Sequence, residues 1–247
     1  MCVIINQMSN RKALPKVFLS LAWRATVVVV FTIVAGIMVI LAMGYRVNID
    51  QRTLEPTGAV TINGKLSNIE IYAGGVKVGD KLPITITGLT PTNTLQLRIT
   101  KNDYVTWAKN VMVEQGLVTS VGEVKLWFSN PLINDAQNVA KVQACETINP
   151  SNADDLLIFG GEIRTKSGLI TRISSPVVAA CWFEDNNHVV FATAKNVFII
   201  EADGDNAHSI YSTDRTIDNV GASPNDNIVY VGLQDAGWKQ IMVAKPE

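Results

Sequence analysis

The chain has 247 residues, of which 47% are hydrophobic and 17% charged, and its formal net charge is −1. This balance excludes binding of nucleic acid through a strongly basic surface, and the apolar content excludes a wholly disordered chain. Three cysteines are too few for a disulfide scaffold, and two histidines leave little for a metal site. We therefore expect one or two globular domains without a cofactor.

Residues 25–43 contain no charged side chain. As a helix they would be about 28 Å long, close to the ~30 Å hydrocarbon core of a bilayer. Trp23 and Tyr45 flank the segment, where aromatic residues meet the membrane interface, and Arg24 can extend its charge toward the headgroups. The pattern predicts a transmembrane helix over 25–43, with these three residues as anchors and the lipid bilayer as a partner.

The charge distribution predicts the orientation of this helix. Residues 1–24 carry four basic and no acidic side chains, whereas the rest of the chain carries 17 basic and 22 acidic ones. By the positive-inside rule, residues 1–24 are cytoplasmic and the bulk of a single-pass cell-membrane protein is extracytoplasmic. A cleaved signal peptide and a buried helix of a soluble protein are the alternatives. The length of the apolar stretch favours an uncleaved anchor.

A polar juxtamembrane linker is expected at 44–56, followed by a β-sandwich over 57–127. In the latter region, short apolar or alternating runs are separated by Gly, Asn, Asp and Pro. Residues 95–99 alternate most clearly, with three apolar side chains on one face. Seven short strands in about 70 residues are typical of a small sandwich.

The spacing of turn residues in this region resembles that of a PEGA domain. The matching positions are Ala73-Gly74-Gly75, Gly79 with Pro83, Gly88-Leu89 with Pro91, and Lys101 with Tyr104. The Pro-Glu-Gly-Ala signature itself is replaced by Ser67-Asn68-Ile69-Glu70, and Asn102-Asp103 precedes the tyrosine. The order of anchor, spacer and module is also similar to that of membrane-anchored PEGA proteins of bacteria. The resemblance implies a β-sandwich in the cell envelope and no catalytic residues.

Residues 128–154 show few strand signals, and we expect a linker with one or two helical turns near 135–143. Residues 155–247 contain repeated strands, with Trp182 and Ala222 separated by 40 residues. This spacing is usual for propeller blades, and the pattern resembles TolB-like or WD40-like blades. About three blades are present, whereas a closed propeller has 4–8. A fragment of a longer protein is favoured over an arc completed by another chain or a second sandwich.

The predicted fold class is thus an all-β extracytoplasmic region preceded by one transmembrane α-helix. The region combines a PEGA-like β-sandwich with partial β-propeller-like repeats. His188 and His208 are expected to be half-exposed sheet residues. Asp203-Gly204 is expected to form a hairpin turn, because a calcium loop would also need a bidentate glutamate. For Cys145 and Cys181, two buried free thiols are expected because each lies beside small apolar residues, and a disulfide is the alternative in an oxidising envelope.

The candidate ligand-binding residues are Tyr104 with Trp107, expected to be an exposed aromatic pair, and the carboxylates of Glu184 and Asp185 at a rim of the repeats. The sequence contains no recognisable catalytic constellation. We therefore expect a non-enzymatic binding or scaffolding protein of the cell envelope, with a polysaccharide or protein as partner and no nucleic acid. A propeller-type enzyme, and a sensor or transport partner that contacts another membrane protein, are the alternatives.

Overall fold

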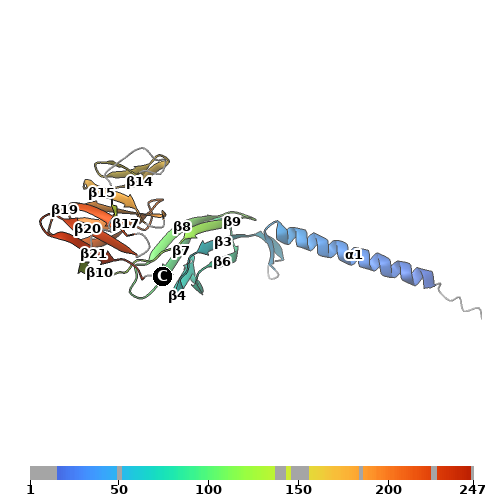
Figure 1. Cartoon of the computed structure of the whole chain (residues 1–247). Coiled ribbons are helices and arrows are strands. Elements are labelled where there is room, and N and C mark those ends of the chain that lie inside the picture. The colour runs from blue at the N-terminus through green and yellow to red at the C-terminus, as the bar shows by residue number, and fades with distance from the viewer. Residues whose placement is uncertain are drawn as a thin grey trace, which may run out of the picture.

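The computed structural model describes residues 16–48, 52–136, 143–145, 156–183, 186–223 and 227–245. The molecule is elongated, with a long helix at one end, a β-sandwich in the middle and a stack of three sheets at the other end (Figure 1). The fold is mostly β-sheet with one apolar helix near the N-terminus, as predicted.

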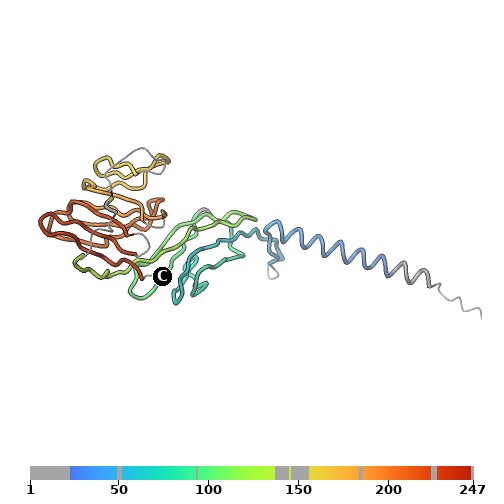
Figure 2. Tube along the Cα trace, in the orientation of Figure 1, coloured from blue at the N-terminus to red at the C-terminus, as the bar shows by residue number. Residues whose placement is uncertain are grey.

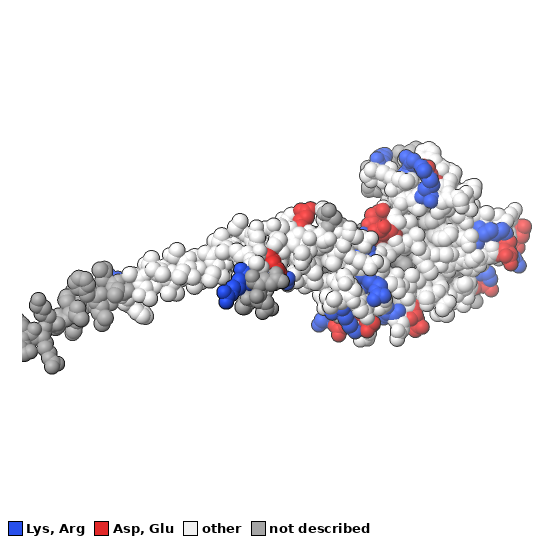
Figure 3. Space-filling view, turned by 180° about the vertical axis from the view of Figure 1, so that it is seen from behind, with Lys and Arg blue, Asp and Glu red and all other residues white. Residues whose placement is uncertain are grey.

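Helix α1 spans Lys16–Ala42, and its segment Trp23–Ala42 is long and apolar enough to cross a membrane. None of this 20-residue segment is buried against the rest of the protein, although a signal sequence would satisfy the same criteria. Its surface is uncharged from Thr26 to the end of the helix (Figure 3). Gly44 ends the helix with a φ of +77°, a left-handed conformation that glycine adopts without steric cost.

The region expected to be a polar linker forms a hairpin instead. Strands β1 (Tyr45–Asn48) and β2 (Thr53–Pro56) pair antiparallel. Arg46 Nη2 lies 2.8 Å from Glu55 Oε2, and Asn48 donates a hydrogen bond to the same carboxylate. Alternate charged and polar side chains obscured this hairpin in the sequence, because no face of it is fully buried.

The sandwich that follows contains the predicted seven strands in two sheets. The strands are β3 (Gly58–Asn63), β4 (Ser67–Ala73), β5 (Val76–Lys81), β6 (Ile84–Leu89), β7 (Thr92–Thr100), β8 (Trp107–Val113) and β9 (Val118–Glu123). One sheet has the order β6-β3-β9 and the other β5-β4-β7-β8. Val60 and Ile62 from one sheet and Leu97 and Ile99 from the other are fully buried in a shared core. The alternation at 95–99 thus reflects burial of one face.

Three further sheets make up the C-terminal part. The first contains β12 (Leu157–Phe159), β13 (Glu162–Thr165) and β14 (Gly168–Arg172). The second contains β15 (Val177–Trp182), β16 (His188–Thr193), β17 (Asn196–Glu201) and β18 (His208–Ser212). The third has the order β10-β21-β20-β19-β11, from β10 (Leu132–Asp135), β11 (Gln143–Ala144), β19 (Ile217–Ala222), β20 (Ile228–Leu233) and β21 (Gly237–Met242).

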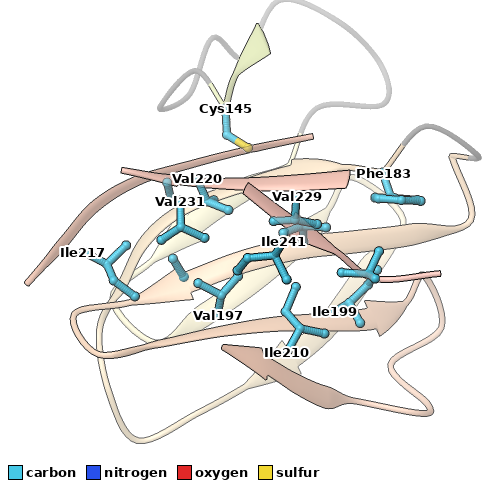
Figure 4. Packing of buried hydrophobic residues seen from close by; sticks show 14 of the residues in the cluster. Cys145, Phe183, Val197, Ile199, Ile210, Ile217, Val220, Val229, Val231 and Ile241 are labelled. Atoms are coloured by element: carbon cyan, nitrogen blue, oxygen red, sulfur yellow. The ribbon is translucent and has the colours of Figure 1, made fainter. Parts of the chain in front are cut away.

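The second of these sheets is covered on both faces. Ala192, Val197 and Ile199 pack toward the five-stranded sheet with Val231 and Ile241 (Figure 4). On the opposite face, the second sheet packs against β12–β14 in a separate core. All six residues of β16 are buried for this reason, which explains its almost continuous apolar sequence.

The three sheets correspond to the three predicted repeats, but among the described residues they form an open stack and no closed ring. The expectation for 128–154 was wrong where it is described. That segment contributes β10 and β11, which pair with β21 and β19 on opposite edges of one sheet. These strands were missed because they are short and add onto edges supplied by residues far along the chain. Residues 137–142, where most of the helical turn was expected, lie outside the described part.

Candidate functional site

The sandwich and the sheet stack are joined through a shared connecting segment. Val124 and Leu126 are buried in the sandwich core, whereas Trp127 is buried in the core of the stack. The end of the last strand returns to this segment, where Phe128 N donates to Val243 O at 2.8 Å (Figure 2). Lys125 Nζ lies 4.8 Å from the ring centroid of Phe183, a cation–π distance. The two units therefore meet at this connecting segment, which contributes side chains to both cores.

The most concentrated polar contact at this boundary lies between β8 and the β17–β18 turn. Lys109 Nζ lies 2.7 Å from Glu201 Oε2, forms an ion pair with Asp203, and is 3.9 Å from Asp205 Oδ2. We call these four residues the interface ion cluster. The side chains of Lys109 and Glu201 are only 19% and 12% exposed, so this pair is shielded from water. Such a pair is more strongly coupled than a surface ion pair.

Two neutral side chains and one backbone amide complete the contact. Trp107 Nε1 donates to Glu201 Oε1 at 2.5 Å, and Asn206 Nδ2 donates to the same oxygen at 2.9 Å. The Ala108 backbone N–H donates to Asn206 Oδ1 at 3.1 Å. Both oxygens of Glu201 therefore have partners across or beside the boundary, which offsets the cost of removing the carboxylate from water.

The interface ion cluster changes the proton affinities of its members. Burial alone would lower the pKa of Lys109, but hydrogen bonds to Asp203 and Glu201 outweigh it and raise the pKa. For Asp203, burial favours a higher pKa, yet the hydrogen bond from Lys109 is decisive and lowers it. Burial and the neighbouring Asp203 charge raise the pKa of Asp205. The single ammonium of Lys109 thus offsets part of the negative charge of the acidic turn in the folded state.

A cleft of about 180 Å³ opens beside this cluster, lined by Trp107, Lys109, Glu123, His188 and Glu201 among others. Pockets for drug-sized ligands usually have volumes of about 300–1,000 Å³. Of the charged groups that line the cleft, Lys109, Glu201 and Asp203 are already engaged with one another. The cleft therefore suits water or a small polar group, and its geometry fits a joint between units.

Tyr104 and Trp107 are the predicted ligand-binding residues that the structure describes. Trp107 is only 4% exposed and belongs to the sandwich core, so the expectation of an exposed Tyr104–Trp107 pair was wrong. Tyr104 is half-buried, with its ring centroid 4.9 Å from that of Phe128, and burial raises its pKa. Glu184 and Asp185 lie outside the described residues. Of the predicted membrane anchors, Trp23 and Arg24 are exposed and Tyr45 is half-buried after the helix.

The histidines also differ from expectation. His188 is 2% exposed rather than half-exposed, and its ring meets Trp127 edge-on at a centroid distance of 4.9 Å. His208 is half-buried as predicted, and its Nε2 atom is buried without a hydrogen-bond partner. Burial lowers the pKa of His208, against a hydrogen bond to the Phe128 backbone. Both rings therefore contribute to the boundary.

Cys145 and Cys181 form a disulfide, so the expectation of two buried free thiols was wrong and the alternative is correct. Their Cα atoms are 5.1 Å apart, within the usual range for a bridge. Cys145 N donates to Val220 O in β19, and Cys181 belongs to β15. The bond therefore links the two neighbouring sheets of the stack.

Lys109 and Glu201 are the residues that sequence reasoning missed. The alternation in β8 places Lys109 on the same inward face as Trp107 and Val111, where a charge requires a partner. That position was a usable signal, but it could not identify a partner 92 residues later.

In the described part of the chain, no three His, Cys, Asp or Glu side chains are placed to hold a metal ion. No protein-family model matches the chain, and no curated protein is significantly similar to it.

Proposed function

We propose that the chain is a non-enzymatic binding or scaffolding protein of the cell envelope, anchored by α1 with its β-rich part outside the cytoplasm. In this proposal the sandwich is a PEGA-like module, and the propeller-like stack is held on it as a second module. A cell-envelope polysaccharide or protein is the partner, and of the two candidate ligand-binding residues that the structure describes, Tyr104 stays partly open.

The observation that carries this proposal is that the apolar helix α1 is exposed and that its end is hydrogen-bonded to a folded β-sandwich. None of Trp23–Ala42 is buried against the rest of the protein, so this predominantly apolar 20-residue segment would face water unless lipid or another protein covered it. A helix satisfies its own backbone hydrogen bonds, which lipid requires.

Two further observations support the proposed orientation. Residues 1–24, which precede the uncharged run 25–43, carry four basic and no acidic side chains, as expected for a cytoplasmic end. The Cys145–Cys181 disulfide lies on the other side of the helix, and disulfides persist in oxidising compartments outside the cytoplasm.

Cysteine labelling of intact cells tests the proposal. The variant Phe159→Cys, in a Cys2→Ser background, places a thiol at a position 61% exposed in the sheet stack. A membrane-impermeant maleimide should label this thiol in intact cells, or in spheroplasts if an outer membrane is present. The matched control retains Cys2 and Phe159 and should react only after lysis, because both other cysteines are bridged.

The mass of the labelled protein separates an anchor from a signal sequence. We expect a full-length chain that resists alkaline carbonate extraction from membranes. Labelling of the Phe159→Cys variant only after lysis would refute the orientation, and a soluble product lacking α1 would refute the anchor.

A further inference from the structure

Five exposed apolar side chains surround the point where α1 ends. They are Met43, Val47, Leu54, Leu117 and Val118, with exposed fractions of 60%, 56%, 51%, 55% and 62%. We call these residues the apolar collar. Single exposed apolar residues are common, but these five come from three chain segments that meet at one end of the sandwich.

Backbone contacts hold the three segments together. A Cβ atom added to Gly44 would clash with Gly116 Cα, so the two backbones touch without side chains between them. Thr57 N donates to Gly44 O at 2.6 Å, and Gly116 N donates to Thr57 O at 2.9 Å. The β8–β9 turn that carries Leu117 is therefore fixed against the end of the helix.

The β1–β2 hairpin supplies the remaining two side chains. Val47 and Leu54 are directly opposite each other in its register. Figure 1 shows the hairpin beside the end of α1, running across the helix axis. Arg46, at the neighbouring position, is held to Glu55 and donates to Gly88 O in the sandwich. The hairpin is thereby attached to both the helix and the sandwich.

The length of the helix places this end of the sandwich at the depth of the lipid headgroups. A helix over Trp23–Ala42 is about 30 Å long, which matches the hydrocarbon core. The headgroup region adds only about 5–7 Å on each side. Gly44 is two residues beyond Ala42, and Gly116 contacts it, so Leu117 and Val118 cannot lie far from the hydrocarbon boundary.

We propose that the apolar collar inserts into the headgroup–acyl boundary of the bilayer that α1 spans. The sandwich then rests directly on the membrane in one fixed orientation, rather than swinging on a flexible tether. A lipid surface is the occupant because the collar begins at Met43, the residue that directly follows the exposed apolar helix α1. This inference rests on the proposed function, since it requires α1 to be embedded in a membrane.

Site-directed spin labelling of the full chain in phosphatidylcholine nanodiscs tests the inference. Three variants are made in the Cys2→Ser background: Leu117→Cys, Phe159→Cys and Val34→Cys. Leu117 tests the collar, Phe159 is an equally apolar exposed control on the distant stack, and Val34 reports on α1. Power saturation compares collisions of each label with oxygen, which partitions into lipid, and with a water-soluble nickel complex.

For the label at position 117, we expect the oxygen-to-nickel collision ratio to shift from the value at position 159 toward the value at position 34. A Val118→Cys label should shift in the same direction. If the collision ratio at position 117 equals that at position 159 while position 34 remains lipid-exposed, the proposed insertion of the collar is refuted. The proposal that α1 is a membrane anchor is then unaffected. If position 34 is also accessible to nickel, both proposals fail. Dipolar broadening between labels at position 117, with low access to both reagents, would show a second copy covering the collar and would overturn the inference.

Discussion

Lys109 Nζ on the sandwich lies 2.7 Å from Glu201 Oε2 on the sheet stack, although 92 residues separate them in the chain. Trp107 Nε1 reaches the other oxygen of the same carboxylate at 2.5 Å. Two side chains from the inward face of β8 thus bind a single glutamate of the neighbouring unit, one through an ion pair and the other through a hydrogen bond. This relationship makes the boundary between the units sensitive to changes in charge.

Replacing Lys109 with methionine should weaken the boundary. The substitution preserves the aliphatic stem but leaves Glu201, Asp203 and Asp205 without their shared cation. Because Lys109 and Glu201 are largely shielded from water, we expect a loss of about 1–3 kcal/mol in the free energy of unfolding. Chemical denaturation in detergent, followed by tryptophan fluorescence, measures this loss.

Lys77→Met is the matched control, since Lys77 pairs with Glu70 where both side chains are 51% exposed. We expect no measurable change for this variant, because solvent and salt screen exposed pairs. Equal effects of the two substitutions would contradict the role assigned to the interface ion cluster.

Trp107→Phe should separate the hydrogen bond to Glu201 from the packing of the ring. The substitution retains an aromatic side chain in the sandwich core but removes the Nε1 donor. We expect a loss of about 1–3 kcal/mol, because the donor serves a charged acceptor. In a double-mutant cycle with Lys109→Met, the two losses should be non-additive, since both act on Glu201. Strict additivity would argue against a shared contact.

Stability should fall on mild acidification because of His208. Its pKa is lowered in the folded state, so the unfolded chain binds the proton more readily. The stabilisation is therefore complete above the unfolded pKa of about 6.5 and decreases as the pH falls below it. His208→Gln should flatten the stability profile in this range, as measured by denaturation at a series of pH values.

Asp203 acts in a lower pH window, which provides an internal control. Its folded pKa lies below the usual value of 3.8, so its contribution is lost only on further acidification. The loss below about pH 3.8 should persist in His208→Gln and diminish in Asp203→Asn. A profile unchanged by His208→Gln between neutral pH and about pH 5 would contradict the assignment to this histidine.

Loss of the disulfide should destabilise the stack more than the sandwich. The bond closes a loop of 36 residues, for which chain-entropy arguments give about 3–4 kcal/mol. We expect Cys145→Ala with Cys181→Ala to expose the amides of β15 and β19 to faster hydrogen exchange, while those of β4 and β7 change little. Equal acceleration in both units would show that they do not unfold separately.

Gly44→Ala should loosen the joint between α1 and the sandwich. The added Cβ would clash with Gly116 Cα and meet Thr57 O at 2.9 Å, and both are backbone atoms that cannot rotate away. Faster exchange of the Thr57 amide, which is bonded to Gly44 O, is the expected result. Gly75→Ala is the control, because Gly75 also has a positive φ but no atom within 4 Å of the new Cβ. If each substitution accelerated amide exchange around its own site to a similar extent, the effect of Gly44→Ala would be explained by backbone strain alone.

Local patterns in the sequence were sufficient to predict the elements whose own side chains follow one regular pattern. The alternation at 95–99 predicted the burial of Leu97 and Ile99, and the uncharged run predicted α1. Prediction failed where a residue is defined by distant partners. β10 is exposed along its length and exists through its pairing with β21, more than 100 residues later. Trp107 was expected to be available for binding because the glutamate that receives its N–H lies in another unit.

The position of strand β16 between two hydrophobic cores affects how the sheet stack unfolds. Val190 belongs to the core shared with the five-stranded sheet, whereas its neighbour Phe191 belongs to the core shared with β12–β14. Separation of either outer sheet would expose one side of this strand to water. The two cores therefore share a single structural element, and the three sheets are expected to unfold as one cooperative unit.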